Sequence, residues 1–215
     1  MIKILANDGL SETGIKKLEE NGFIVITEKV QQIDLIPTVN REKYEVILVR
    51  SATTIRKEVI NACPSIKIIG RGGVGMDNID VEYAKEKGLE VYNTPASSSV
   101  SVAELVFAHL SGMIRFLHKS NREMPLDGDS KFKELKKSFG GGKELTGKTI
   151  GIIGFGRIGQ EVAKRAIGLG MNVLAHDKFT NEANITLNFF NGDKKTFSIE
   201  TLSLQDVLKD SDFIT

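Results

Sequence analysis

The stretch TIGIIGFGRIGQEVAKRA, residues 149–166, decides the fold class of this 215-residue sequence. Its beginning, TIGIIG, is short, apolar and rich in isoleucine, as in a buried strand, and the residues that follow have the apolar spacing of an amphipathic helix. Between the two lie Gly154, Gly156 and Gly159, in G-x-G-x-x-G spacing. A strand, this glycine turn and a helix predict the first βα unit of a dinucleotide-binding domain.

Each glycine of the turn has its own expected role. Gly154 lets the chain turn tightly, Gly156 lets a pyrophosphate approach the backbone, and Gly159 lets the helix pack against its strand. We expect the amides of Arg157 and Ile158 to face the phosphates, because the first turn of a helix has free N–H groups and a partial positive charge. The alternative is a plain connection between strand and helix, without a ligand.

An acidic residue closes the next apolar stretch, MNVLAHD. This residue is Asp177, 177 − 159 = 18 residues after the last glycine and near the ~20 typical of the dinucleotide motif. A carboxylate there accepts hydrogen bonds from the adenosine ribose and repels a 2′-phosphate, so it favours NAD over NADP as the cofactor. Lys178, beside it, weakens that preference.

Residues up to Pro95 repeat one pattern: a short apolar run, a turn and an amphipathic run. This alternation predicts an α/β fold with a parallel sheet and helices on both faces. The segment around Pro37 is the weakest of the predicted helices. The predicted strands are rich in Val and Ile and lie at residues 2–6, 23–27, 45–51, 66–72 and 89–95.

Two neighbouring strands of this sheet carry arginines at their carboxyl ends. Arg50 and Ser51 close one strand, and the turn GRGGVGMDNID follows the next with Arg71, Val74 and Gly75. Ligands of doubly wound sheets bind beyond the carboxyl ends of the strands, and both glycine turns and arginine forks bind anions. These residues predict a crevice for a carboxylate or phosphate; alternatively, each arginine forms a surface ion pair.

The segment SVSVAELVFAHLSGMIRFLHKSNRE predicts one long helix. Ser101 and Glu104 are three residues apart before an apolar run, which is the spacing of a capping box. We therefore expect the helix to begin there and to end near Lys119. Apolar residues on more than one side of this helix predict that it packs against a domain or another subunit.

Two later segments have weaker patterns. Residues 125–148 are rich in glycine and lysine and predict a short helix followed by a surface loop with solvated lysines. Residues 186–198 contain the Asn191-Gly192 pair, which predicts the turn of a β-hairpin.

Composition excludes several classes of partner and site. The net charge of +1 gives no basic surface for nucleic acid, and no apolar run reaches the ~18 residues of a membrane span. The N-terminus lacks the pattern of a signal peptide, and Cys63 is the single cysteine, so we expect no intrachain disulfide and a reducing, cytoplasmic location. His109, His118 and His176 are too few and too scattered to predict a metal cluster.

Several of these stretches together resemble the D-isomer-specific 2-hydroxyacid dehydrogenase family. GRGGVGMDNID, VYNTPASSSVSVAEL and ELTGKTIGIIGFGRIGQEVAKRAIGLGMNV look like the signatures of that family, in its order and spacing. The resemblance implies an oxidoreductase that transfers a hydride between a D-2-hydroxy acid and NAD. It also implies a flavodoxin-like substrate-binding domain at residues 1–97 and a Rossmann domain for NAD at residues 98–215, incomplete after its third strand.

The resemblance implies roles for the matched residues. Arg50, Ser51 and Arg71 would contact the acid or phosphate end of the substrate, and the backbone of Val74 and Gly75 would hold its carboxylate near the nicotinamide. Members of the family form homodimers through their cofactor domains, and the long helix from Ser101 would belong to that contact. The residues implied to bind the cofactor are Val74, Gly154, Gly156, Arg157, Ile158, Gly159 and Asp177.

The stretch LVRSATTI looks most like the branch of the family that oxidises 3-phosphoglycerate to 3-phosphohydroxypyruvate at the start of serine biosynthesis. Hydroxypyruvate/glyoxylate reductases and D-lactate-type dehydrogenases are alternatives within the family, and a non-catalytic NAD-binding co-repressor is an alternative outside enzymes. The Arg, Glu and His that act in catalysis in the family fall after the last residue of this sequence. We therefore expect no catalytic residue among the 215, and a longer natural chain.

Overall fold

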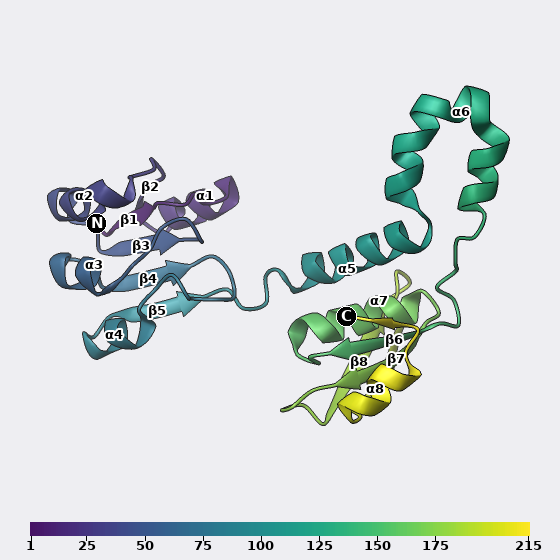
Figure 1. Cartoon of the computed structure of the whole chain (residues 1–215). Coiled ribbons are helices and arrows are strands. Elements are labelled where there is room, and N and C mark those ends of the chain that lie inside the picture. Colours follow the sequence, from purple (N-terminus) through teal and green to yellow (C-terminus); the bar gives the residue numbers. More distant parts are fainter. The chain divides into compact units, whose positions relative to one another are not determined.

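The computed structural model describes every residue from Met1 to Thr215. Contacts between Cα atoms divide the chain into two compact units, Met1–Ser98 and Ser99–Thr215, which we call the N-terminal unit and the C-terminal unit. Figure 1 labels most of the helices and strands of both units along the chain. Each unit has a parallel sheet and helices, so the predicted α/β class is confirmed.

The N-terminal unit is built on a five-stranded parallel sheet with the strand order β2-β1-β3-β4-β5. The winding direction reverses between β1 and β3, and doubly wound sheets bind ligands at such a switch point, beyond the carboxyl ends of the strands. Each strand coincides with one of the predicted apolar runs. The strands are β1 (Lys3–Ala6), β2 (Ile24–Ile26), β3 (Val46–Val49), β4 (Ile68–Arg71) and β5 (Glu90–Asn93).

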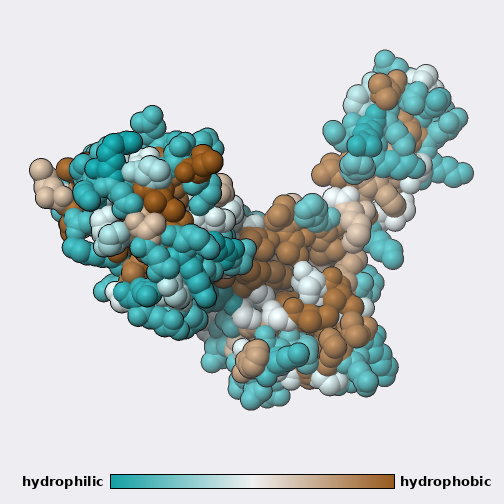
Figure 2. All heavy atoms as spheres, turned by 60° about the vertical axis from the view of Figure 1, so that its left-hand side comes forward, coloured by the Kyte–Doolittle hydropathy of each residue, from teal (hydrophilic) through white to brown (hydrophobic).

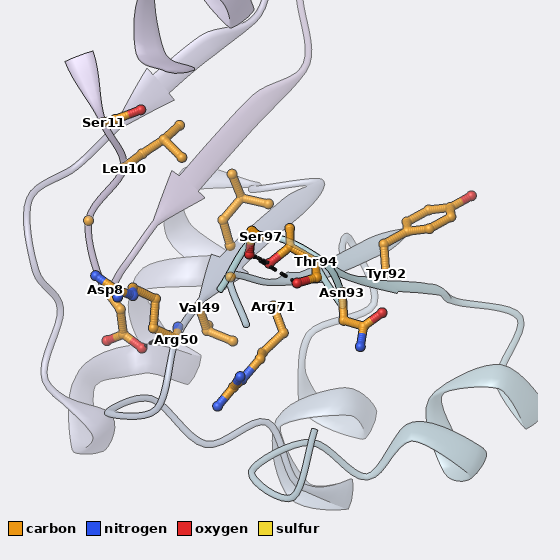
Figure 3. Close-up of a pocket in the computed structure, with 14 residues that line it drawn as sticks. Asp8, Leu10, Ser11, Val49, Arg50, Arg71, Tyr92, Asn93, Thr94 and Ser97 are labelled. Atoms are coloured by element: carbon orange, nitrogen blue, oxygen red, sulfur yellow. Dashed lines mark hydrogen bonds between the residues drawn. The ribbon is translucent and has the colours of Figure 1, made fainter. Parts of the chain in front are cut away.

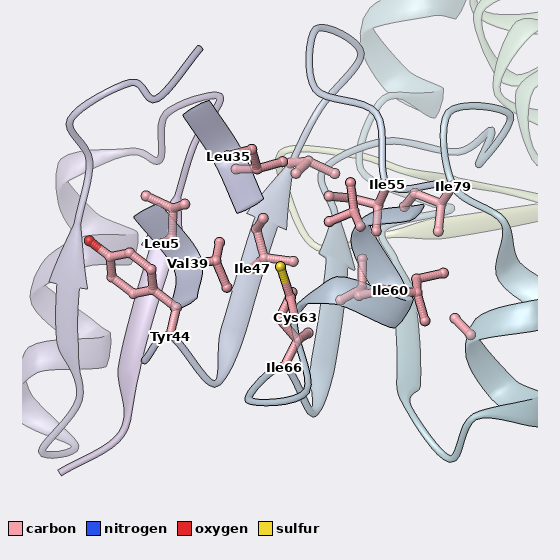
Figure 4. Close-up of a cluster of buried hydrophobic side chains, with 14 residues drawn as sticks. Leu5, Leu35, Val39, Tyr44, Ile47, Ile55, Ile60, Cys63, Ile66 and Ile79 are labelled. Atoms are coloured by element: carbon pink, nitrogen blue, oxygen red, sulfur yellow. The ribbon is translucent and has the colours of Figure 1, made fainter. Parts of the chain in front are cut away.

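Helices connect these strands and cover the core. The weakest predicted helix, around Pro37, is present, and Pro37 lies in its first turn, where a missing amide costs no helical hydrogen bond. Figure 4 shows Leu5 and Ile47 of the sheet packed with Val39 and Ile60 of the helices, all buried. The helical elements are α1 (Glu12–Glu20), the short 3₁₀ helix η1 (Gln32–Asp34), α2 (Leu35–Glu42), α3 (Lys57–Ala62) and α4 (Val81–Glu86).

The C-terminal unit contains a three-stranded parallel sheet in the order β10-β6-β7. A single parallel bridge also pairs Ala175 of β7 with Thr201, on the side of β7 away from β6. The hydrophobic core of this unit contains Phe155, which follows β6. Phe107 of one helix, Val162 of another and Ile185 of a hairpin belong to the same core. The elements are α5 (Ser99–Ile114), α6 (Leu117–Phe139), β6 (Thr149–Ile153), α7 (Arg157–Gly168), β7 (Asn172–His176), β8 (Glu182–Asn188), β9 (Lys194–Glu200), α8 (Leu204–Asp210) and β10 (Phe213–Ile214).

The predicted hairpin around Asn191-Gly192 is confirmed. Strands β8 and β9 pair antiparallel, with Asn188 opposite Lys194 at the end nearest the turn. Gly192 has a φ of 88°, a left-handed conformation that glycine adopts without strain. The hairpin is not a separate excursion, because Ile185 on β8 is fully buried in the core of the unit.

The long helix differs from its prediction. It breaks after Ile114 at Phe116, which has a φ of 55°, and helical structure then continues to Phe139 instead of ending near Lys119. Pro125 and a bend at Lys131 interrupt α6, but the many lysines, glutamates and leucines around them favour helix. No single helix has the length and apolar character of a membrane span; the pair α5 and α6, bent by 53°, meets those criteria only when taken together.

The capping-box interpretation of Ser101 and Glu104 was wrong. Helix α5 begins at Ser99, so Ser101 lies inside the first turn and cannot be the residue that precedes it. Glu104 instead pairs with Arg165 of α7, with 3.1 Å between Oε1 and Nη2. This pair lies where α5 packs against α7.

Candidate functional site

The carboxyl ends of β1, β3, β4 and β5 surround a cavity of about 900 Å³ in the N-terminal unit (Figure 3). Arg50, directly after β3, and Arg71, the last residue of β4, both line it. The predicted pair of arginines is therefore brought to one cavity. The other side chains that line its polar end are Asp8, Asn93, Thr94 and Ser97.

The apolar end of the same cavity lies on the face of the sheet opposite α2, α3 and α4. Leu48 and Gly70 form its floor, Leu10 borders it before α1, and Tyr92 at its rim is 58% exposed. This part of the cavity has no cationic side chain in its lining, so only the strand ends offer charged groups that recognise an acid.

The glycine turn that follows Arg71 leaves room for its guanidinium. A Cβ atom at Gly73 would lie 1.8 Å from Nη1 of Arg71, so the guanidinium occupies the space that any side chain at position 73 would need. The Nε–H of Arg71 is buried and has no hydrogen-bond partner in the chain. A donor left without a partner in this way is available to a bound anion.

Val74 and Gly75 lie on this turn rather than in the cavity lining. Asn93 donates from Nδ2 to the carbonyl of Val74 at 2.7 Å, and the amide of Thr94 donates to the carbonyl of Gly73 at 3.1 Å. These two bonds fix the turn to the end of β5. The amides of Val74 and Gly75 make no hydrogen bond within the chain, so they are free for an anion, as predicted for a backbone cradle.

Ser51 lies in a smaller hollow beside the main cavity, with a volume of about 320 Å³. Arg50 lines both spaces and connects them. Lys29 adds a second cation to the hollow, and its ammonium lies 3.7 Å from Oδ1 of Asp8. Our sequence interpretation missed both Lys29 and Asp8, although each lies two residues after the end of a predicted strand.

The glycine turn of the C-terminal unit joins β6 to α7, as predicted. Gly154 has a φ of 99°, and a Cβ atom at Gly159 would lie 2.2 Å from the carbonyl oxygen of Gly154, so the fold itself requires both glycines. Gly156 is different, because its φ is −76° and no atom lies within 4 Å of the position of its Cβ. Nothing within the chain requires a glycine there, but a ligand that touches the backbone would.

The N-terminus of α7 is uncapped. Gly156 is the N-cap residue and has no side chain to offer, and the first helical hydrogen bond runs from the Gln160 amide to the Gly156 carbonyl. The amides of Arg157 and Ile158 therefore have no partner in the chain. Free amides at the positive end of a helix form a site for phosphate.

Asp177 follows β7 and faces the same turn. Its Oδ2 accepts from the Phe155 amide at 2.7 Å, and its Oδ1 accepts from the amides of Phe179 and Thr180 at 2.7 and 2.9 Å. The bonds from Phe179, Thr180 and Phe155 hold the pKa of Asp177 below its usual range, so the side chain is an anion at neutral pH. A carboxylate has about four acceptor positions, so about one remains for a ribose hydroxyl.

These features of the C-terminal unit fit a dinucleotide: two free amides at a helix N-terminus, an open space above Gly156, and an anionic carboxylate at the end of the next strand. Of the three histidines, only His176 lies at this site, directly before Asp177, and its carbonyl accepts from the Gly154 amide at 2.8 Å. His176 forms a hydrogen bond from Nδ1 to the carbonyl of Leu202, and His109 and His118 line a hollow at the break between α5 and α6. No group of three metal-binding side chains is present.

A family model described as the D-isomer specific 2-hydroxyacid dehydrogenase catalytic domain matches residues 4–207. This chain belongs to the D-isomer-specific 2-hydroxyacid dehydrogenase family. The family resemblance predicted from the glycine turns is thus confirmed, and with it the class of oxidoreductases.

Relatives within this family have more than one activity. The chain is 38% identical over 217 residues to a hydroxypyruvate reductase of Thermotoga maritima, which covers 99% of this chain and 63% of that protein. It is 41% identical over 179 residues to a D-3-phosphoglycerate dehydrogenase of Methanocaldococcus jannaschii, which covers 83% of this chain and 33% of that protein. The family assignment therefore leaves the substrate open.

Solved structures agree with the fold. The structure of NAD⁺-bound 3-phosphoglycerate dehydrogenase from Entamoeba histolytica has 26% sequence identity and a TM-score of 0.66, over 99% of this chain and 61% of that one. The chain thus spans less than two thirds of the length of each of these three relatives.

Proposed function

We propose that this protein transfers a hydride between a D-2-hydroxy acid and NAD, and that the acid is 3-phosphoglycerate, oxidised to 3-phosphohydroxypyruvate in cytoplasmic serine biosynthesis. The observation that carries the proposal is the open turn at Gly156, a glycine that the fold does not need, below two free amides of α7. Family membership and the NAD⁺-bound relative support it.

The two units would divide the binding of substrate and cofactor between them. The order β2-β1-β3-β4-β5 of the N-terminal unit is that of flavodoxin-like sheets, and we propose that this unit binds the substrate. In the C-terminal unit the bridge at Thr201 extends the order to Thr201-β7-β6-β10, which corresponds to 3-2-1-4 of a Rossmann sheet. We propose that this unit binds NAD through an incomplete Rossmann fold.

Asp177 supports NAD rather than NADP. Its ionised carboxylate would accept a hydrogen bond from the 2′-hydroxyl of the adenosine ribose and would repel a 2′-phosphate at the same place. The nicotinamide supplies the hydride acceptor when the cofactor is bound. The chain itself would hold the pyrophosphate at Arg157 and Ile158 and the ribose at Asp177.

Two cations support a substrate with two acidic ends. Arg50 and Arg71 line one cavity, and the amides of Val74 and Gly75 are free beside Arg71. A carboxylate on the glycine turn and a phosphate near Arg50 and Ser51 would use all of these groups. Lactate or glyoxylate, with one acidic end, would leave one cation unused.

The proton of the substrate hydroxyl needs a base. No histidine lines the substrate cavity, and the ring of His176, beside the cofactor turn, is hydrogen-bonded to the carbonyl of Leu202. We therefore propose that residues 1–215 bind substrate and cofactor, and that turnover needs an Arg, a Glu and a His outside this range. We also propose a homodimer through the C-terminal unit. Val102, Leu105 and Met113 of α5 are exposed there, and Figure 2 shows apolar surface gathered over this unit.

The proposal is tested with the protein encoded by the complete gene. Its rates of NAD reduction with 3-phosphoglycerate, D-glycerate and D-lactate are compared, and we expect 3-phosphoglycerate to give the highest kcat/KM. The 215-residue chain is assayed beside it and should bind NAD in calorimetry without turnover. An equal rate with unphosphorylated acids would exclude the phosphoglycerate assignment, and an absence of NAD binding would exclude the cofactor site.

A hydroxypyruvate reductase is the second candidate. It is favoured by the 38% identity with the Thermotoga maritima enzyme, which extends over 99% of this chain. The same protein would then oxidise NADH with hydroxypyruvate faster than it reduces NAD with 3-phosphoglycerate. Substitution of Arg50 separates the two, because hydroxypyruvate has no phosphate for Arg50 to hold.

A further inference from the structure

Asp8, two residues after β1, is buried beside the loop that carries Arg50 and Ser51. Its side chain is 4% exposed. Oδ2 accepts from the amides of Arg50 and Thr53 at 2.7 and 3.0 Å, and Oδ1 accepts from the hydroxyl of Thr53 at 2.7 Å. One carboxylate thus binds both ends of the loop across the switch point between β1 and β3.

Asn78 holds the same loop by its carbonyl groups. Its Nδ2 donates to the carbonyls of Arg50 and Thr53, at 2.8 and 2.6 Å. Asn7 donates to the hydroxyl of Thr53 at 2.8 Å, so that hydroxyl is fixed from both sides. The backbone at both ends of the loop is therefore held by side chains, and Arg50 and Ser51 line their cavities from a fixed frame.

The charge of Asp8 is unfavourable for an anion site. Burial alone raises the pKa of Asp8, but the hydrogen bonds from Arg50 and Thr53 outweigh it and keep the pKa below its usual range, so the residue is ionised at neutral pH. The negative charge would repel a phosphate or carboxylate bound near Arg50, and Lys29 at 3.7 Å compensates for it in part. Through charge alone, Asp8 would weaken substrate binding.

We propose that Asp8 is a positioning residue for substrate binding: it fixes the loop at Arg50–Thr53 so that Arg50 and Ser51 reach the acid end of the substrate. The inference rests on the proposed function, because that function assigns the loop to the substrate. The loop takes three of the about four acceptor positions of Asp8, so we assign its carboxylate to the loop rather than to the substrate. The benefit of a fixed loop outweighs the repulsion.

This proposal and a purely electrostatic role predict opposite signs for Asp8→Asn. The substitution removes the charge and one acceptor oxygen. Loss of repulsion would lower the KM for 3-phosphoglycerate, whereas loss of loop position raises it. We expect KM to rise on the order of tenfold. We expect kcat and the KM for NAD to change less than about twofold, because the loop does not take part in cofactor binding.

Two further variants separate loop position from general stability. Thr53→Val removes the hydroxyl that bonds Asp8 and should raise KM in the same direction, while Thr53→Ser keeps the hydroxyl and should resemble the wild type. Asp80→Asn is the matched control. Asp80 also accepts a backbone amide, that of Lys57 at 2.9 Å, in the same unit, but its side chain makes no bond to residues 50–53, so its substitution should leave KM unchanged.

The experiment uses the protein from the complete gene, with thermal unfolding to show that each variant is folded. If Asp8→Asn folds and its KM for 3-phosphoglycerate is unchanged or lower, the proposal is overturned. If Asp8→Asn does not fold, an unchanged KM for 3-phosphoglycerate in Thr53→Val overturns it. If the wild type oxidises no 2-hydroxy acid, the proposed function fails instead. Hydrogen exchange of the amides of residues 50–53 then tests whether Asp8 fixes the loop. The exchange should be faster in Asp8→Asn and unchanged in Asp80→Asn. An unchanged exchange rate in both variants contradicts the positioning role.

Discussion

The carboxylate of Asp177 accepts a hydrogen bond from the amide of Phe155, with 2.7 Å between oxygen and nitrogen. The bond joins the glycine turn after β6 to the end of β7, so one side chain fixes both parts of the candidate cofactor site. Asp177 therefore has a role within the fold, beside the role toward a ribose that we propose for it.

Asp177→Ala is expected to weaken NAD binding on the order of tenfold and to reduce the preference for NAD over NADP, because the carboxylate that distinguishes the two riboses is lost. Calorimetric titration of both dinucleotides measures this. Asp212→Ala is the control, since Asp212 accepts the Thr149 amide at 2.9 Å in the same unit, away from the turn. Unchanged affinities in Asp177→Ala would show that Asp177 is not the ribose acid.

Gly156→Ala is expected to keep the fold and lose the cofactor. The φ of −76° suits alanine and no atom lies within 4 Å, so the stability cost should not exceed ~1 kcal/mol. A methyl group in the path of a pyrophosphate should weaken NAD binding by a factor of ~10 or more. Gly168→Ala is equally open, at the other end of α7, and should bind NAD normally. Normal NAD binding by Gly156→Ala would contradict the proposed site.

Gly159→Ala is expected to destabilise the C-terminal unit by about 2–3 kcal/mol, because the new Cβ would lie 2.2 Å from the carbonyl oxygen of Gly154. The obstructing atom belongs to the backbone and cannot rotate away. Urea unfolding followed by circular dichroism measures the loss, with Gly156→Ala as the comparison. Equal stability of the two variants would mean that α7 shifts without cost.

Acid should destabilise the C-terminal unit through its two hydrogen-bonded carboxylates. Backbone bonds from Phe179, Thr180 and Phe155 lower the pKa of Asp177, and the Thr149 amide and Lys148 lower that of Asp212. An aspartate whose pKa is lower in the folded state than in the unfolded state stabilises the fold. This stabilisation is complete above the pKa of the unfolded state, about 3.9, and is lost as the pH falls through the pKa of the folded state. The urea midpoint should therefore fall below about pH 4. The urea midpoint should fall less with pH in Asp212→Asn, which lacks one of the two carboxylates. A urea midpoint of the wild type that does not change with pH would contradict this prediction.

Sequence patterns predicted those helices and strands for which the conformational preference of the residues agrees with their place in the tertiary structure. The apolar runs of the N-terminal unit became strands because each pairs in the parallel sheet, and β1, β3 and β4 bury side chains there. The Asn191-Gly192 pair predicted its hairpin because Gly192 adopts the left-handed conformation that the turn needs. The short helix predicted within residues 125–148 is present as the second part of α6, which ends at Phe139 before the predicted loop. Its continuity with the residues before Pro125 was not predicted, because Pro125 and Gly128 indicate a break. The start of α5 was predicted too late, because the spacing of Ser101 and Glu104 resembles a capping box. In the structure Glu104 forms an ion pair with Arg165 instead.

The candidate site was predicted in part for the same reason. Glycine turns and strand-end arginines are visible in a short stretch of sequence, so Arg50, Arg71 and the Gly154–Gly159 turn could be named. Asp8 could not, because its hydrogen-bond partners Arg50 and Thr53 lie 42 and 45 residues away along the chain. Only the pairing of β1 with β3 brings them together.

The β8–β9 hairpin also bears on the order in which the C-terminal unit forms. Its cross-strand partners are near neighbours in the chain, such as Asn188 and Lys194, whereas β10 must find β6 across most of the unit. Closing a short loop loses less chain entropy than closing a long one. The hairpin should therefore form first. Its buried residue Ile185 would then provide an apolar surface against which the parallel strands and α7 pack.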